Sequence, residues 1–230
     1  MLIRSGGPAF SDQQAASNYP LRGGKYQLWE GGIRSTAFVS GGLLPPKMRG
    51  TNITSLVHVC DWWVTFTKLA GGDATDGDGS VVPKLDGLDQ WPILSGASTA
   101  AVRSEVFPAK GVLIQGQWKL VLGGAGGTAM WSGQHYPKVP ATGPRTLDCG
   151  AGCLFDVESD PEERLNLNGS TAHASLISSM QSRLAALEKT IWQANPRQTN
   201  TSIKQVCDMS LSQGEWLTPA DWHPQWARES

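Results

Sequence analysis

The chain has 230 residues, enough for one or two domains with a substantial hydrophobic core. Apolar residues make up 40% of it and charged residues 17%, which excludes a disordered, highly charged protein. Because 19 Lys and Arg residues balance 20 Asp and Glu residues, and no stretch approaches the roughly 20 apolar residues of a membrane span, we expect no nucleic-acid partner and no membrane partner.

In the first half of the chain, glycine pairs interrupt the first 35 residues, which are expected to form loops. Residues 36–40 (TAFVS) predict a short buried strand. Residues 62–70 predict a helix that is capped by Asp61 and ends at Gly71, where glycine supplies the left-handed turn. The acidic residues 71–79 indicate a solvated loop rather than a calcium loop, because no Glu closes the pattern.

In the second half, residues 111–122 (GVLIQGQWKLVL) predict an antiparallel hairpin, and residues 123–152 indicate a surface insertion rich in Gly, Pro and Thr. A helix is predicted over residues 172–193, capped by Thr171 and followed by Asn195 and Pro196. It should cover the antiparallel sheet with an apolar stripe made of Leu176, Met180, Leu184, Leu187 and Ile191. The aromatic tail, residues 214–226, is expected to fold back onto the body.

The cysteines and the glycosylation triplets concern the cellular compartment. Cys149 and Cys153 are close enough in sequence to close a small loop by a disulfide, with structural thiols as the alternative, and no zinc-pair spacing is present. Three acceptor triplets, at Asn52, Asn168 and Asn200, suggest a secretory history, although chance supplies one or two in a chain of this length. Residues 1–7 (MLIRSGG) lack the apolar core of a signal peptide.

The segment over residues 18–32 (NYPLRGGKYQLWEGG) is the candidate binding segment. Arg22, Lys25 and Glu30 lie there among glycines, where the backbone can approach a ligand and cations can meet an anion. The alternative is that Arg22 pairs with Glu30 while Lys25 is solvated. Self-contained catalytic motifs, such as a phosphate-binding glycine loop or a nucleophile elbow, are absent from the sequence.

These residues belong to a set of blocks that resembles the sulfatases, especially the arylsulfatase B-like branch. The blocks follow the family order over nearly the whole chain: residues 20–25 (PLRGGK), 28–34 (LWEGGIR), 58–63 (HVCDWW), 69–71 (LAG), 86–89 (DGLD), 118–121 (WKLV), 154–157 (LFDV), 160–163 (DPEE) and 166–167 (NL). The resemblance implies the C-terminal part of an alkaline-phosphatase-like α/β fold, with a small antiparallel sheet packed by a C-terminal helix. It divides the chain into residues 1–105, the remainder of the large domain, and residues 106–230, a small α+β subdomain with the tail.

The resemblance further implies hydrolysis of a sulfate ester with a calcium ion and a formylglycine nucleophile. The Cys/Ser-x-Pro-x-Arg motif that yields this nucleophile is absent from the 230 residues. Where the family carries Asp-Asn-Gly-Gly, residues 4–7 read Arg-Ser-Gly-Gly, and an arginine cannot coordinate calcium. We therefore expect a fragment without calcium ligands and without turnover on its own.

By resemblance, Lys25 is the lysine that contacts the substrate sulfate and neutralises its charge, and it is the only family residue that carries over. Arg22, the other cation named in the segment, is expected to be a second substrate-binding residue. Arg22, Trp29 and Glu30 are also expected to shape the loop beneath Lys25. His58 matches no catalytic histidine of the family, and we expect it to be packed or to cap a helix.

The substrate class implied is a sulfate ester, including sulfated glycans, and the route is secretory, lysosomal or extracellular. Two alternatives stay open. One is a non-catalytic module that binds sulfated glycans through Lys25, Arg22 and tryptophan faces. The other is a phosphate- or phosphonate-ester hydrolase of the same superfamily, which an upstream nucleophile of a different type would reveal.

Overall fold

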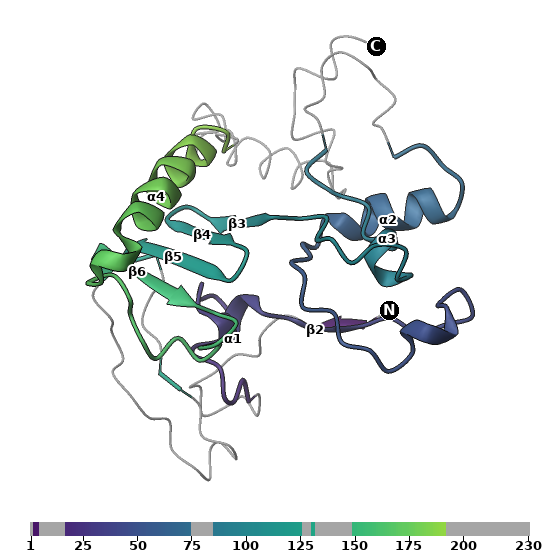
Figure 1. The fold of residues 1–230 in the computed structure, drawn as a ribbon, viewed down its shortest axis with the longest axis horizontal. Helices are drawn as coiled ribbons and strands as arrows, with labels where there is room; N and C mark the ends of the chain where they lie inside the picture. The colour runs from purple at the N-terminus through teal and green to yellow at the C-terminus, as the bar shows by residue number, and fades with distance from the viewer. Residues whose placement is uncertain (1, 5–16, 75–84, 126–129, 132–148, 192–230) are drawn as a thin grey trace, which may run out of the picture. The chain divides into compact units, whose positions relative to one another are not determined.

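The computed structural model describes residues 2–4, 17–74, 85–125, 130–131 and 149–191, which are coloured in Figure 1. Contacts group the chain into Met1–Lys189 and Thr190–Ser230, and every helix and strand below belongs to the first group. The predicted boundary between residues 105 and 106 stays a prediction. Within the described ranges, no helix has both the length and the apolar character needed to cross a membrane. The tail over residues 214–226 lies outside these ranges.

A four-stranded antiparallel sheet has the order β3-β4-β5-β6, with β3 at Glu105–Ala109, β4 at Val112–Gln115, β5 at Trp118–Gly123 and β6 at Cys149–Asp156. Strands β4 and β5 confirm the predicted hairpin, and Gly116 in their turn adopts a φ of +54° that glycine tolerates. The surface insertion predicted over residues 123–152 is wrong at its end, because residues 149–152 belong to β6, where Cys149 pairs with Gly123.

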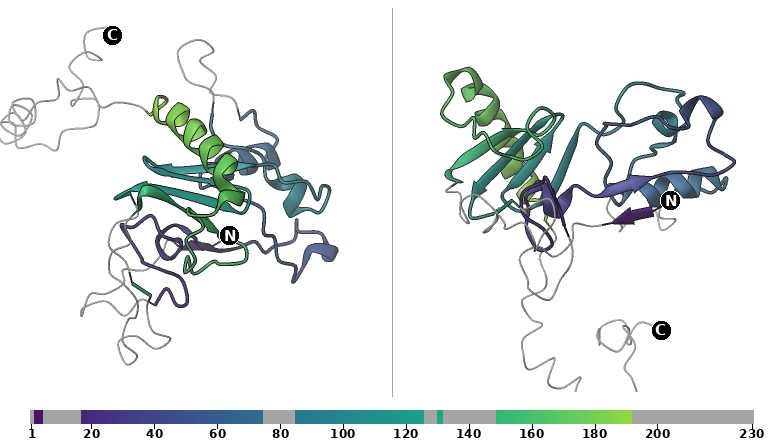
Figure 2. Two further views of the ribbon diagram at one scale, coloured as in Figure 1. Left: turned by 60° about the vertical axis from the view of Figure 1, so that its left-hand side comes forward. Right: turned by 90° about the horizontal axis from the view of Figure 1, so that it is seen from below.

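Helix α4 (Ala174–Glu188) covers one face of this sheet and follows the 3-10 helix η2 (Thr171–His173), as Figures 1 and 2 show. Met180 and Leu184 of α4 form a buried cluster with Leu113, Leu120 and Leu154 of the sheet. The predicted sheet-covering helix is thereby confirmed, and so is the expected combination of an antiparallel sheet with a C-terminal helix.

The ends of α4 differ from the prediction. Thr171 is not the cap, because residues 171–173 form a separate 3-10 turn and His173 takes the cap position. The helix ends at Glu188, so Ile191 lies beyond it, while Asn195 and Pro196 lie outside the described residues.

The other face of the sheet packs on Trp29, the residue that precedes the short helix α1 (Glu30–Ile33). Because neighbouring strand residues face opposite sides, Leu120 lies in the α4 cluster while Val121 lies in the Trp29 cluster. Both faces of the sheet are therefore buried, and one of them supports the candidate binding segment.

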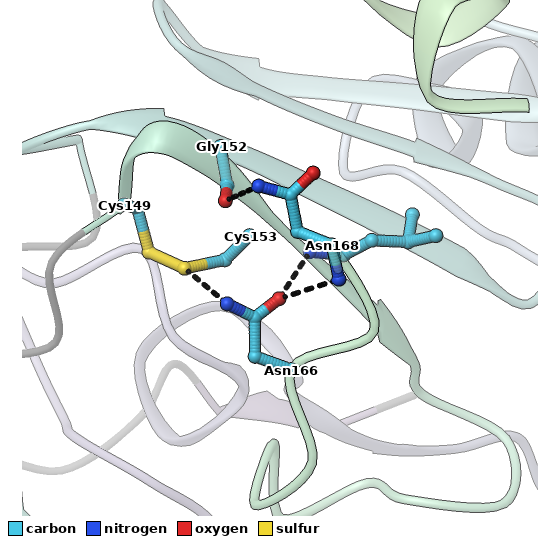
Figure 3. The surroundings of a disulfide bond; sticks show 6 residues. Cys149, Gly152, Cys153, Asn166 and Asn168 are labelled. Atoms are coloured by element: carbon cyan, nitrogen blue, oxygen red, sulfur yellow. Dashed lines mark hydrogen bonds between the residues drawn. A yellow bond between two sulfur atoms is a disulfide. The ribbon is translucent and has the colours of Figure 1, made fainter. Parts of the chain in front are cut away.

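Cys149 and Cys153 form a disulfide within β6, which confirms the disulfide alternative (Figure 3). Val121 pairs with Cys153 and Gly123 with Cys149, so β6 carries extra residues opposite β5. The disulfide spans this β-bulge, in which Gly152 adopts a φ of +96°.

Helix α2 (Asp61–Leu69) ends as predicted, with Gly71 at a φ of +76°. The prediction that Asp61 caps it is wrong, because Asp61 is the first helical residue and its carboxylate serves other segments. It accepts the backbone N–H groups of His58 and Leu88, each at 2.8 Å, and it pairs with the Arg103 guanidinium. Asp61 thereby connects α2 to two later segments. One contains Leu88 and precedes α3 (Trp91–Leu94), and the other contains Arg103 and precedes β3.

Strand β2 (Thr36–Phe38) pairs with β1 (Leu2–Arg4), and the 3-10 helix η1 (Pro46–Met48) follows. The strand predicted over residues 36–40 is confirmed at residues 36–38, but its predicted burial is wrong, because all three residues of β2 are exposed. Among the described residues the sheet of β1 and β2 has only these two strands, and a two-stranded sheet buries little apolar surface by itself.

Candidate functional site

The candidate binding segment forms a tight turn just before α1, and Lys25 lies in that turn. The Gln27 backbone N–H donates to the Gly24 carbonyl oxygen at 3.0 Å, and the Gln27 side-chain Oε1 accepts the Gly24 N–H at 2.9 Å. The Gly31 N–H donates to the Arg22 carbonyl oxygen at 2.7 Å. These bonds close the turn twice and fasten it to α1.

Two glycines of α1 allow the turn to lie directly on the helix. A Cβ at Gly31 would lie 2.4 Å from the Arg22 carbonyl oxygen, and a Cβ at Gly32 would lie 2.1 Å from that of Gln27. Real Cβ atoms do not approach backbone oxygens this closely, so both positions require glycine. The Gly-Gly pair that follows Glu30 in the sequence is therefore a packing requirement of the turn.

Beneath the turn, Arg22 is stacked on two tryptophans. Its Cζ lies 4.0 Å from the ring centroid of Trp29 and 4.7 Å from that of Trp131. Arg22 is only 1% exposed, and burial lowers its pKa although Glu163 acts in the opposite direction. The Trp131 ring also carries the guanidinium of Arg164, 4.7 Å from its centroid. Arg22 is thus one of the buried residues that support the turn.

A buried ionic cluster holds the start of α1. Lys119 of β5 is 0% exposed, and its Nζ lies 2.9 Å from Glu30 Oε1 and 2.7 Å from Glu163 Oε1. Glu163 Oε2 accepts the Glu30 backbone N–H at 2.7 Å. This cluster takes the place of the Arg22–Glu30 pair that the sequence left open.

Burial raises the pKa of Glu163, and the repulsion from Glu30 adds to this effect, while Lys119 acts against it. Glu163 also has a φ of +57°, unusual for a residue with a side chain. Its backbone conformation and its burial are both maintained by the cluster, so residue 163 is a structural anchor of α1.

Above this support, Lys25 and Tyr26 are exposed. Tyr26 is 93% exposed, and Lys25 Nζ lies 5.1 Å from the centroid of its ring. Within the described part of the chain, the Lys25 ammonium makes no ion pair. A cation held on a fixed turn and facing solvent is suited to receiving an anion.

Two of the glycosylation candidates, Asn52 and Asn168, belong to the described residues. Asn52 is exposed, whereas Asn168 is partly buried and its Nδ2 donates to the Gly152 carbonyl oxygen at 2.5 Å (Figure 3). The Asn168 backbone N–H donates to Asn166 Oδ1 at 3.0 Å. Asn200 lies outside the described residues.

His58 lies beside the Asp61 network. Its Nδ1 is 2.9 Å from Cys60 Sγ, burial lowers the His58 pKa, and burial together with Asp61 raises the Cys60 pKa. Both shifts favour the neutral forms near pH 7, which suits a packed pair better than an activated thiol. The expectation of a packed histidine agrees with this arrangement.

No family model matches the chain. In sequence it is 31% identical over 205 residues to arylsulfatase J of Mus musculus, an alignment that covers 76% of this chain and 32% of the mouse protein. The chain is therefore similar in sequence to part of an arylsulfatase. It spans about a third of the length of the mouse protein.

The similarity of the chain to solved structures is weaker than its similarity to the mouse protein. A Bacteroides thetaiotaomicron structure, described under metabolism of multiple glycosaminoglycans, has a TM-score of 0.38 and 16% identity, covering 56% of this chain and 24% of the other. A structure in complex with its substrate D-glucosamine-2-N,6-O-disulfate has a TM-score of 0.32 and 17% identity, covering 56% and 23%. With scores this low, the sulfatase relationship rests on the mouse protein.

The described residues of the chain do not fit a calcium site. Among them, no group of three or more His, Cys, Asp or Glu side chains is arranged to hold a metal ion. Residues 4–7, which the resemblance matches to the family's calcium ligands, begin with an arginine, and a guanidinium has no lone pair for a cation. No step below passes through calcium.

The sequence did not reveal that Lys119, Glu163 and Trp131 of this chain are parts of the site. The only available signal was a lysine within the otherwise apolar run of residues 118–122 (WKLVL), because a buried lysine requires an anionic partner. Nothing local identifies that partner, since Glu30 lies 89 residues away along the chain.

Proposed function

We propose that the chain supplies the sulfate-contacting lysine of a sulfuric ester hydrolase of the arylsulfatase type, with an alkaline-phosphatase-like α/β fold. The observation that carries the proposal is the position of Lys25: an exposed ammonium on a turn whose underside is fixed by stacked and ionic contacts. The resemblance of residues 20–34 to the sulfatases and the 31% identity to the mouse protein support it.

In this proposal, Lys25 donates hydrogen bonds to the sulfate oxygens and offsets the negative charge that gathers on them as the ester bond breaks. Arg22 positions the turn from below, through its contacts with Trp29 and Trp131. Charge stabilisation alone makes no bond, and these 230 residues contain no formylglycine motif. The nucleophile therefore has to come from elsewhere, and we expect this chain alone to bind sulfate esters without hydrolysing them.

The non-catalytic alternative is a module that binds sulfated glycans and never hydrolyses them. The exposure of Lys25 beside an aromatic side chain favours it, because this pair is available for binding without any further group. Hydrolysis of a sulfate ester by a longer form of the protein would distinguish the hydrolase from the binding module. Hydrolysis of 4-nitrophenyl phosphate would test the alternative of a phosphoester hydrolase.

The experiment is an NMR titration of the full 230-residue chain with 4-nitrophenyl sulfate. We expect saturable binding that Lys25→Ala abolishes. Lys110→Ala, which removes another exposed lysine, is the matched control and should bind like the unmodified chain. Absence of saturable binding, or equal loss in both variants, overturns the proposal.

The whole protein is proposed to follow the secretory route to a lysosomal or extracellular location. Support comes from the Cys149–Cys153 disulfide, since disulfides persist in oxidising compartments, and from the glycosylation triplets.

A further inference from the structure

We infer that Tyr26 is a specificity-determining residue that stacks on the sugar ring of a sulfated saccharide whose sulfate is held by Lys25. The inference rests on the proposed function and names its substrate class: a sulfate ester of a sugar rather than of a small alcohol or a free anion.

The first observation is the exposure of the ring. Tyr26 is 93% exposed, so its aromatic faces are almost entirely open to solvent. Aromatic faces, which are apolar with a negative quadrupole, accept the C–H groups of a sugar ring, and the tyrosine hydroxyl stays in water.

The second observation is the backbone conformation. Tyr26 has a φ of +70°, in the left-handed region that is strained for a bulky residue. The double closure of the turn by Gly24 and Gln27 maintains it, and glycine would adopt it without strain. A strained aromatic at a solvent-facing position gains nothing from packing, which points to a contact made with a ligand.

The third observation is the proximity of the ring to the cation. Lys25 Nζ lies 5.1 Å from the Tyr26 ring centroid. A sulfate bound to this ammonium would therefore bring the sugar that carries it next to the tyrosine ring, within reach of an aromatic face. The cation recognises the anion and the ring recognises the sugar, so the two side chains divide the recognition of one ligand.

The test compares two probes on the full chain by NMR titration: glucosamine 6-sulfate and inorganic sulfate. The key variant is Tyr26→Asn, because asparagine tolerates the left-handed conformation and removes only the ring. Tyr26→Phe retains the ring and is the matched control.

We expect Tyr26→Asn to weaken binding of glucosamine 6-sulfate by about threefold to tenfold and to leave inorganic sulfate unchanged. Tyr26→Phe should bind both probes like the unmodified chain. If Tyr26→Asn weakens both probes equally, or neither, the ring does not read the sugar and the inference fails while the role of Lys25 stands. If the unmodified chain binds neither probe, the proposed function and this inference both fail.

Discussion

Lys119 Nζ lies 2.9 Å from Glu30 Oε1 in the protein interior, although the two residues are 89 positions apart in the sequence. The pair connects β5 to the first residue of α1, on which the Lys25 turn lies. Residues from the second half of the chain therefore fix the position of a candidate binding residue in the first half.

Replacing Lys119 should destabilise the protein far more than replacing Glu163. Lys119→Met removes the cation nearest to two buried carboxylates and leaves Glu30 only the more distant Arg34, so we expect a loss of about 3–5 kcal/mol in the free energy of unfolding. Glu163→Gln keeps an acceptor for the Glu30 N–H and leaves Lys119 paired with Glu30, so the loss should be about 1 kcal/mol. Urea denaturation of both variants measures the difference, and equal losses would contradict the ionic role of Lys119.

The contribution of Asp61 should disappear in acid. Burial acts to raise the Asp61 pKa, but hydrogen bonds from Arg103, His58 and Leu88 lower it below the ordinary value of about 3.9. Because the folded pKa is the lower one, the stabilisation is present above the ordinary value and is lost as the pH falls through the folded pKa. The stability difference between the unmodified chain and Asp61→Asn should be constant from pH 7 to pH 5 and shrink below pH 4. A difference that grows on acidification would refute this assignment.

Adding one methyl group at Gly32 should disturb the Lys25 turn. The Cβ of Gly32→Ala would meet the Gln27 carbonyl oxygen, so the turn has to move, at a cost of about 1–3 kcal/mol. We expect weaker binding of 4-nitrophenyl sulfate as well as lower stability. Gly42→Ala is the matched control, since nothing lies within 4 Å of its Cβ. Normal sulfate binding in Gly32→Ala would show that the turn does not need this packing.

The disulfide should contribute modestly to stability. Its loop is short, and loop closure of this size is worth about 2 kcal/mol. The double variant Cys149→Ala, Cys153→Ala should lose this amount in chemical denaturation, and a reducing agent should produce the same loss in the unmodified chain only. A reducing agent that also destabilises the double variant would place the effect elsewhere.

Among the described acceptors, glycosylation should favour Asn52 over Asn168. Asn52 is exposed, whereas a glycan on Asn168 would have to displace a side chain that is seated against the Gly152 carbonyl (Figure 3). Expressed with an export signal in a eukaryotic host, the chain should lose glycan mass with Asn52→Gln and keep it with Asn168→Gln. The opposite pattern would show that the Asn168 contact yields to the glycan.

Local patterns were sufficient for several elements. The hairpin of β4 and β5, helix α4 and the disulfide all depend on residues within about 20 positions of one another, so spacing and periodicity predict them. Strand β2 was predicted as buried from its apolar residues, but burial depends on a covering layer that a local pattern cannot reveal.

The candidate site was predicted only at its surface. Residues 20–34 drew attention to Lys25 and Arg22, yet the stacking of Arg22 on Trp131 joins positions far apart in the sequence. Asp61 shows the same limit on a smaller scale: its helical pattern suggested a cap, while its partners, Leu88 and Arg103, come from later segments. Ion pairs between residues far apart in the chain produce no periodic pattern in the sequence, so periodicity cannot predict them.

The long reach of these contacts has a consequence for the order in which the protein folds. At the start of α1, the Glu30 backbone N–H donates to the carboxylate of Glu163, which lies 133 residues later in the chain. During synthesis, the Lys25 turn emerges from the ribosome long before Lys119 and Glu163, which support it in the folded structure, have been synthesised. We therefore expect the turn to acquire its final geometry only after residue 163 has been synthesised, and a chain interrupted before that residue would present Lys25 on a segment without these contacts.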